Sequence, residues 1–174
     1  FDELRAGRGQ VVLFAGEPGI GKTRLAETLT HVAELNDTTV LWAHCHEVER
    51  APAFWPWLQI VRSSLKSSPT EHLTTDLGVG AGPIAQVIPD IRALLPETPV
   101  PPELDPDQAR FRFFESVTTY LGRLSERRPL VLIIDDLHWA DRSSLMLLEF
   151  LGDEIAAQRI MLVGTYRDAE AAGN

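Results

Sequence analysis

The sequence predicts an α/β protein of three layers, in which helices cover both faces of a mainly parallel sheet. Two observations carry this prediction: short apolar runs rich in β-branched residues recur along the chain, and segments with helical periodicity separate them. The first run, Gln10 to Gly16, ends at a glycine, and the second, Thr38 to Cys45, follows a helical segment. Together these segments form a βαβ unit, which requires a right-handed crossover.

The helix between these two strands is expected to begin at Lys22. One of its faces is apolar and is predicted to pack on the sheet, formed by Leu25, Ala26, Leu29, Val32 and Ala33.

The second half of the chain repeats the alternation of helices and strands. A long helix is predicted from Pro106 to about Glu126, because proline is favoured at the first helical position. Further strands are predicted at Leu130 to Ile134 and Arg159 to Tyr166, with a helix at Ser143 to Leu151 between them. The inward stripe of the long helix is predicted to consist of Phe111, Phe114, Val117, Leu121 and Leu124.

The middle of the chain, residues 48–106, is rich in proline and is predicted to be a helical insertion with exposed loops. Short helices are expected at about Trp57 to Lys66 and Ile84 to Leu95. The aromatic segment Phe54 to Trp57 has two interpretations, a partner surface or a set of side chains that pins the insertion to the core. We favour the second, because aromatic residues beside prolines most often pack inward.

Composition limits the classes of function. The chain has 174 residues, 44% of them hydrophobic and 24% charged, which suits one folded domain. The net charge of −9 argues against direct contact with nucleic acid. No apolar run reaches the ~18 residues of a membrane span, so no membrane contact is expected. The single cysteine, Cys45, excludes an intrachain disulfide and favours a cytoplasmic location.

The segment GEPGIGKT matches the phosphate-binding pattern G-x-x-x-x-G-K-[ST] at every fixed position. Its glycines let backbone N–H groups approach phosphate oxygens, and the following helix N-terminus attracts anions. Lys22 is predicted to bind the β- and γ-phosphates, and the Thr23 hydroxyl to bind Mg²⁺. The predicted ligands are therefore ATP or ADP with Mg²⁺, held by Gly16, Glu17, Pro18, Gly19, Ile20, Gly21, Lys22, Thr23 and Arg24.

Two carboxylates end the strand LVLIIDD. Asp135 is predicted to hold Mg²⁺ together with Thr23, and Asp136 to polarise the water that attacks the phosphate. A local capping role is the alternative for Asp136. Asp141 is interpreted as the N-cap of the next helix, while His138 and Trp139 either line the site or belong to a packed turn.

Arg167 ends the last strand and is predicted to contact the γ-phosphate. Its alternative role is a surface ion pair with Asp168. The chain has no Asn-Lys-x-Asp motif, which favours adenine over guanine. The segment from His44 to Glu47 suggests a zinc site, but a strand end beside the nucleotide is preferred, because no second Cys/His cluster completes a tetrahedral site.

The segments GEPGIGKTRLA, VLIIDDLHWAD, LVGTYRD and HCHEVERAPAFWPW together resemble the ATPase domain of the large ATP-dependent LuxR-type transcriptional regulators. The same domain type is joined to some bacterial adenylate cyclases and kinases. These proteins belong to the STAND class of P-loop NTPases, which is similar to the AAA+ proteins. The resemblance spans nearly the whole chain.

The resemblance implies a sheet of order 2-3-4-1-5 and a switch in which ATP favours a self-associating form of the full-length protein and slow hydrolysis resets it. It assigns Lys22 and Thr23 to the Walker A motif, Asp135 to Mg²⁺, Asp136 to hydrolysis and Arg167 to the first sensor. The fifth strand, the helical lid and the DNA-binding helix-turn-helix are expected to lie outside these residues, so residues 1–174 are expected to be a partial ATPase core.

Two other functions fit the motifs. A P-loop kinase that phosphorylates a small acceptor is expected to carry a basic lid and an acceptor pocket. A nucleotide-dependent interaction module binds ATP without hydrolysing it. Substitution of Asp136 separates the ATPase from the passive module, because a loss of hydrolysis with retained binding supports the ATPase.

Overall fold

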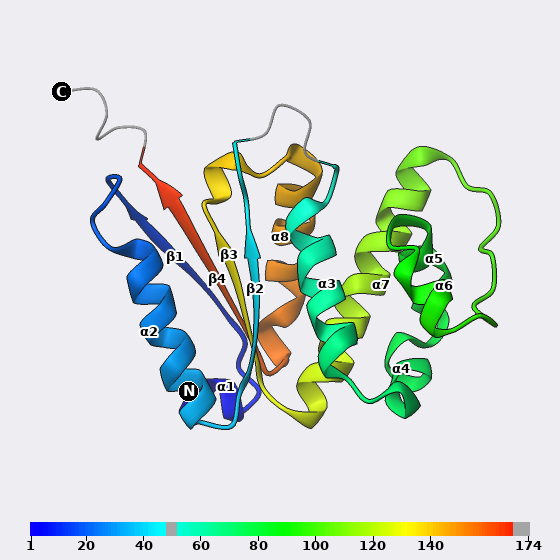
Figure 1. The fold of residues 1–174 in the computed structure, drawn as a ribbon, viewed down its shortest axis with the longest axis horizontal. Helices are drawn as coiled ribbons and strands as arrows, with labels where there is room; N and C mark the ends of the chain where they lie inside the picture. Colours follow the sequence, from blue (N-terminus) through cyan, green and yellow to red (C-terminus); the bar gives the residue numbers. More distant parts are fainter. Residues whose placement is uncertain (48–51, 169–174) are drawn as a thin grey trace.

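The computed structural model describes residues 1–47 and 52–168, and its centre is a parallel sheet (Figure 1). In this part of the chain the sheet has four strands in the order β1-β4-β3-β2, and every neighbouring pair is parallel. This arrangement confirms the α/β class, and it places β4 between β1 and β3. The strands are β1 (Gln10–Gly16), β2 (Thr39–His44), β3 (Leu130–Asp135) and β4 (Ile160–Arg167).

Helices cover both faces of the sheet, as the sequence predicts (Figure 1). One face carries α1 (Asp2–Arg5) and α2 (Lys22–Leu35), and the other carries α3 (Trp55–Ser67), α7 (Pro106–Arg127) and α8 (Arg142–Glu154). Each face has its own apolar cluster, because side chains of a strand alternate between the two faces. In β3, for example, Val131 and Ile133 face α2, whereas Leu132 and Ile134 belong to the larger cluster with α3, α7 and α8.

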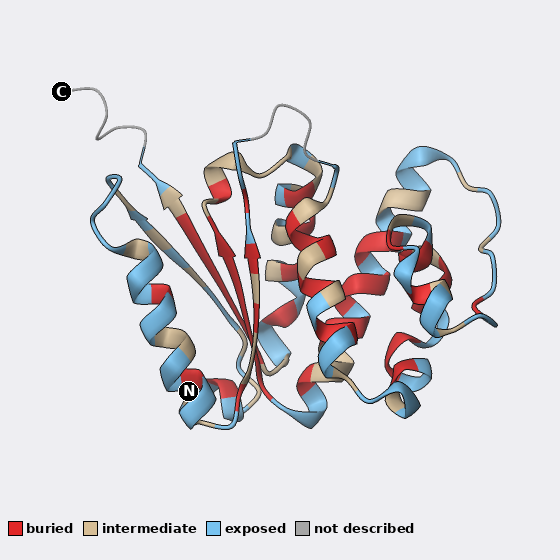
Figure 2. Cartoon of the chain, in the orientation of Figure 1, coloured by how far each residue is buried: buried red, intermediate tan, exposed pale blue. Residues whose placement is uncertain are grey.

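The inner strands are buried on both faces, and the edge strand β1 is not (Figure 2). All residues of β3 are buried, which explains their continuous apolar run. On β1, Val11 and Leu13 keep 43% and 51% of their surface exposed. Within the described residues β1 is an edge strand, since β4 is the one strand that pairs with it.

In the proline-rich segment, α3 packs on β2, whereas residues 70–94 fold as short helices on the far side of α7 from the sheet (Figure 1). Trp57 fixes α3 to α8, because its indole N–H donates to the carbonyl of Ser144 at 2.9 Å and the ring is fully buried. This confirms that the aromatic residues here pack inward. The first residues of the expected insertion, 48–51, lie outside the described residues. The remaining elements are α4 (Thr70–Leu77), η1 (Gly78–Gly80), α5 (Ala81–Val87), α6 (Asp90–Leu94), η2 (Leu137–Trp139) and η3 (Ile155–Ala157).

One expected helix in this segment had the wrong bounds, and one helix was not expected at all. The helix expected from Ile84 to Leu95 is divided into α5 and α6, because Pro89 has no N–H to continue the hydrogen-bond ladder. Helix α4 was missed, since its eight residues contain two leucines as the sole large apolar side chains.

The expected apolar faces were also wrong in part. Phe111 is 53% exposed on α7, and Leu25 and Val32 are 52% and 38% exposed on α2. Helix α7 packs between α8 and the insertion helices, so it buries two faces, and Phe113 and Tyr120 lie inside. Helix α2 contacts the sheet mainly through its small residues and Leu29, which leaves its other large side chains outside.

Candidate functional site

The phosphate loop connects β1 to α2 at the carboxyl end of the sheet. Gly19 and Gly21 have φ angles of 80° and 104°, in the left-handed region that favours glycine. A Cβ atom at either position would meet nothing within 4 Å. The two glycines are therefore required by the turn of the backbone, and the concave side of the loop is left open.

The N-terminus of α2 lacks the side-chain caps that α7 and α8 carry. Asp105 caps α7 by accepting from two backbone N–H groups, and Asp141 caps α8 by accepting from the backbone N–H of Ser144. This confirms the capping role predicted for Asp141. Helix α2 has Gly21 at its N-cap, no side-chain cap and no acidic residue in its first turn. Its first N–H groups and the positive end of its dipole therefore suit an anion.

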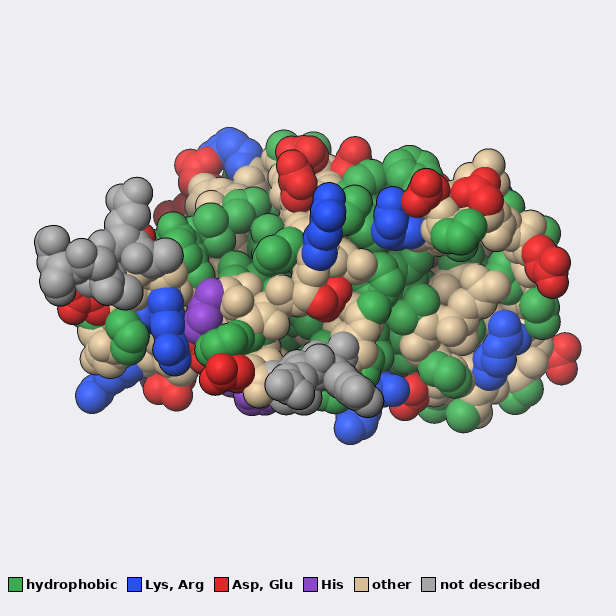
Figure 3. Space-filling model, turned by 90° about the horizontal axis from the view of Figure 1, so that it is seen from above, with side chains coloured by type: hydrophobic (Ala, Val, Ile, Leu, Met, Phe, Trp, Pro, Cys, Tyr) green, Lys and Arg blue, Asp and Glu red, His purple; other side chains and the backbone are tan. Residues whose placement is uncertain are grey.

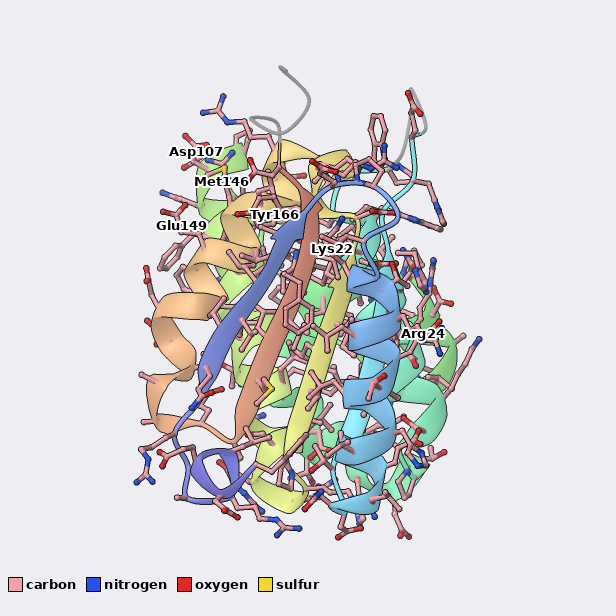
Figure 4. All side chains as sticks on the ribbon, turned by 90° about the vertical axis from the view of Figure 1, so that its left-hand side faces the viewer. Lys22, Arg24, Asp107, Met146, Glu149 and Tyr166 are labelled. Atoms are coloured by element: carbon pink, nitrogen blue, oxygen red, sulfur yellow. The ribbon has the colours of Figure 1, made fainter. Side chains whose placement is uncertain are left out.

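Lys22 lies over the loop that precedes it. Its Nζ donates to the carbonyl oxygens of Gly16 at 2.8 Å and of Glu17 at 2.9 Å. The ammonium group is thus held beside the N-terminus of α2, where a phosphate would lie. Arg24 projects from the outer side of α2, away from Lys22 (Figure 4), so the structure does not bring it to the inner side of the loop.

Asp135 is a buried carboxylate that lies close to hydroxyl and imidazole groups. Only 5% of its surface is exposed, and both of its carboxylate oxygens lie 3.2 Å from the Thr23 hydroxyl. His44 Nδ1 lies 3.6 Å from one of these oxygens. Among the described residues no lysine or arginine pairs with Asp135. A buried negative charge of this kind favours a cation, and oxygen ligands suit Mg²⁺.

Thr165 completes this group, and the sequence analysis missed it. Its hydroxyl donates to Asp135 Oδ1 at 2.5 Å and accepts from the backbone N–H of Asp136 at 2.9 Å. It stands beside Asp135 because β4 pairs with β3 in a register that matches Ile134 with Gly164. Thr165 stands in the segment LVGTYRD, but the sequence alone does not tell that β4 is the neighbour of β3 and so brings this threonine to Asp135.

Asp136 follows the strand in a left-handed conformation, with φ of 59°. This conformation is costly for a residue other than glycine, and the N–H bond to Thr165 helps to hold it. The Asp136 carboxylate lies 3.8 Å from His138 Nδ1. The turn therefore directs a second carboxylate to the end of the sheet, beside the buried one.

His138 lies beside the two carboxylates of Asp135 and Asp136, but it has no hydrogen-bond partner among the described residues. Both of its ring nitrogens are buried without a hydrogen bond, and the ring packs on Trp139 with centroids 5.1 Å apart. Burial lowers the pKa of His138 below its ordinary value. Two unsatisfied nitrogens in a polar cluster have a free-energy cost, which a ligand or water at this place would reduce.

Arg167 ends β4, which lies between the loop and Asp135. The register pairs Arg167 with Gly16, and the side chain is exposed. Seen from above, the half of the molecule that holds the sheet shows basic, acidic and histidine side chains close together (Figure 3). The fold therefore brings both charge signs to one end of the sheet.

The His-Cys-His segment does not converge on one point. Cys45 is buried in the larger apolar cluster, where burial raises the pKa of its thiol to about 12. His44 and His46 are exposed on the other side, with stacked rings 6.3 Å apart. His44 instead lines a hollow of about 270 Å³ beside Thr23. A hollow of about 500 Å³ lies against α7 in the insertion, away from the loop.

These features define a class of protein. A glycine loop, an uncapped helix N-terminus, an adjacent lysine and a threonine facing a buried aspartate form the site of a P-loop nucleotide-binding domain. Residues 1–163 match the family model described as "AAA ATPase domain". The chain belongs to this AAA ATPase domain family.

Known proteins show more distant similarity. An uncharacterized protein of Rhizobium meliloti (strain 1021) is 26% identical over 180 residues, covering 99% of this chain. The chain spans 18% of the length of that relative. Among solved structures, "Structure of C. elegans PCH-2" has a TM-score of 0.40 and 15% identity over 91% of this chain and 30% of that one. "Structure of Drosophila ORC bound to DNA" has a TM-score of 0.45 and 13% identity over 97% and 71%. Similarity at this level says nothing about what this chain binds.

Proposed function

We propose that this chain is the ATP-binding and ATP-hydrolysing switch domain of a larger bacterial signalling protein. The observation that carries the proposal is the contact of Thr23 Oγ1 with both oxygens of Asp135, at 3.2 Å. This contact joins the first turn of α2 to the acidic end of β3, so a phosphate site and a cation site lie side by side. A nucleoside triphosphate with Mg²⁺ needs this combination.

Each candidate residue then has a distinct task. Thr23 and Asp135 would hold Mg²⁺, which supplies a Lewis acid that neutralises phosphate charge. Lys22 leaves its bonds to the loop carbonyls and binds the β- and γ-phosphates. Asp136 accepts a proton from the attacking water, and Arg167 at the tip of β4 contacts the γ-phosphate and distinguishes ATP from ADP.

The wider role proposed is that of a LuxR-family transcriptional regulator. Its support is the resemblance of the motif segments, together with a bacterial relative that is far longer than this chain. DNA would be bound by another domain, because the net charge of this chain is −9. The described residues include no helix that is long and apolar enough to cross a membrane. Self-association would be a property of the full-length protein.

Calorimetric titration of the chain with ATP and Mg²⁺ tests the site. Lys22→Ala removes the ammonium beside the N-terminus of α2, and Lys66→Ala removes a lysine on α3 as a matched control. Loss of a charged hydrogen-bonding group costs at least about 1.5 kcal/mol, which is more than tenfold in affinity. The proposal expects tight binding by the parent and the control and weak binding by Lys22→Ala. Equal affinities in all three proteins would contradict it.

A second measurement addresses hydrolysis. Asp136→Asn keeps the size of the side chain and removes its basicity, so phosphate release should fall by about 10²-fold or more while ATP affinity stays close to that of the parent. If the parent binds ATP and both proteins release phosphate at the same negligible rate, the chain is a nucleotide-dependent interaction module.

A further inference from the structure

Helices α7 and α8 leave a groove between them on the side away from the sheet. It encloses about 400 Å³ and is lined by residues at positions i, i+3, i+4 and i+7 of each helix. Side chains at this spacing form one continuous stripe along two helical turns. We call this surface the α7/α8 groove, and its lining consists of Asp107, Arg110, Phe111 and Phe114 from α7 and Met146, Glu149, Phe150 and Asp153 from α8.

The floor of the groove is aromatic. Phe150 meets Phe111 edge to face, with ring centroids 5.7 Å apart, and lies 5.8 Å from Phe114. Phe111 nevertheless keeps 53% of its surface exposed. Large aromatic side chains grouped in a surface hollow mark sites where another molecule packs.

The rim of the groove is acidic. Asp107, Glu149 and Asp153 bring three carboxylates, and the one basic residue of the lining, Arg110, is bonded to Asp107 at 2.9 Å. The lining therefore has an excess of two negative charges. Figure 4 shows Asp107 and Met146 side by side at one edge of the molecule, with Glu149 directly below. An occupant with basic side chains beside an apolar anchor complements both the floor and the rim.

The shape of the groove favours a helical occupant. Two neighbouring helices that each present a stripe of two turns, about 11 Å long, form the groove into which the ridge of a third helix packs. An extended strand would instead need a sheet edge with unpaired backbone groups. Here the backbone groups of α7 and α8 are paired within the helices, so contact must come from side chains.

We propose that the α7/α8 groove binds a basic amphipathic helix of a partner protein. Its apolar residues, spaced i, i+3, i+4 and i+7, pack on Phe111 and Phe150, and flanking lysine or arginine residues pair with Glu149 and Asp153. Because α8 begins seven residues after Asp135, the bound helix lies next to the element that follows the nucleotide site. The proposal does not depend on ATP binding.

Fluorescence anisotropy with designed peptides and the whole chain tests the proposal. The probe is a labelled helical peptide of about 18 residues, five turns, with leucine at the apolar positions and lysine beside them. A peptide with glutamate in place of lysine and a scrambled peptide of the same composition are the comparisons. We expect binding of the basic amphipathic peptide in the micromolar range, at least about tenfold tighter than binding of either comparison.

Variants of the chain locate the binding. Phe111→Ala should weaken binding about tenfold or more, because the aromatic ring that the peptide covers is lost. Glu149→Lys should weaken binding and reduce its dependence on salt. Leu35→Ala changes an apolar residue of α2 that is 74% exposed, and it serves as the control. Both Phe111 and Glu149 are exposed, so thermal melting is expected to confirm that the variants fold.

Three outcomes would overturn the proposal. In the first, the scrambled peptide would bind as well as the amphipathic one, which would indicate non-specific charge attraction. In the second, Phe111→Ala and Glu149→Lys would bind the peptide as tightly as the Leu35→Ala control does, so the peptide would lie elsewhere. In the third, sedimentation would find dimers of the chain alone that Phe111→Ala dissociates, and a second copy of the chain would then be the occupant of the groove.

Discussion

Thr165→Val tests the interpretation of the acidic strand end. Valine has the shape of threonine but lacks the hydroxyl, so the substitution removes two hydrogen bonds without opening a cavity. The hydroxyl is buried and connects the Asp135 carboxylate to the backbone N–H of Asp136. Its loss should affect both folding stability and cation binding.

The magnitude follows from the surroundings of the two partners. Asp135 is 5% exposed, so water cannot readily replace the donor. A hydrogen bond to a charged group contributes about 1.5–3 kcal/mol, and a buried N–H left without a partner costs about 1–3 kcal/mol. We expect the free energy of unfolding to fall by about 3 kcal/mol. In a chain of this size each kcal/mol lowers the Tm by about 2–4 °C.

The assay is urea denaturation together with thermal melting, and Thr118→Val is the matched control. Thr118 is also buried on α7, but its hydroxyl has no partner among the described residues. Its replacement by valine should be neutral or stabilising. The reasoning is refuted if Thr165→Val loses less than about 1 kcal/mol, or if the two variants behave alike. Affinity for ATP with Mg²⁺ should fall in Thr165→Val and stay unchanged in Thr118→Val.

Three more predictions concern folding stability. Burial lowers the pKa of His138 from 6.5, so the unfolded chain takes up a proton that the folded chain does not. The free energy of unfolding should therefore fall as the pH drops below 6.5. Between about pH 7.5 and pH 5.5 the Tm of His138→Phe should fall less than the Tm of the parent. Equal pH profiles of the two proteins would contradict this. Gly9→Ala would place a Cβ atom 2.0 Å from a backbone carbonyl oxygen of η3, and urea denaturation should show that the free energy of unfolding falls by about 3 kcal/mol. Gly152→Ala is the control, because its Cβ atom would lie 3.4 Å from the nearest side-chain atom, and its free energy of unfolding should not fall. Tyr120→Phe removes the buried bond to Ser64 at 2.9 Å and should cost about 1 kcal/mol in the same assay, with an unchanged midpoint as the contrary result.

The local elements were predictable where a single physical rule decides them. The strand Gln10–Gly16 has the predicted bounds although none of its residues is buried, because an apolar, β-branched run favours a strand and the loop after it needs glycine. Helix α7 begins at Pro106 as expected. The strand order was not available from periodicity and came from the family resemblance, since residue patterns do not reveal which strands are neighbours.

What the sequence did not reveal depends on contacts between distant segments. Phe111 was expected inside because it fits one face of α7, but that helix packs against elements on two sides and leaves the residue outside. Thr165 was overlooked because its importance arises from the register of β3 and β4. Arg24 belongs to the loop in sequence but lies on the outer side of α2. Such outcomes follow from tertiary packing, which a single-sequence pattern does not encode.

The place of β1 at the edge of the described sheet has a consequence for handling these 174 residues in solution. An unpaired strand edge with Val11 and Leu13 exposed beside it is a template on which a strand of another molecule can add. Natural proteins protect such edges with lysine, and this strand has none. Preparations should therefore become turbid as they are concentrated, and Leu13→Lys should raise the solubility limit. Crystallisation trials and light-scattering measurements would benefit from that variant.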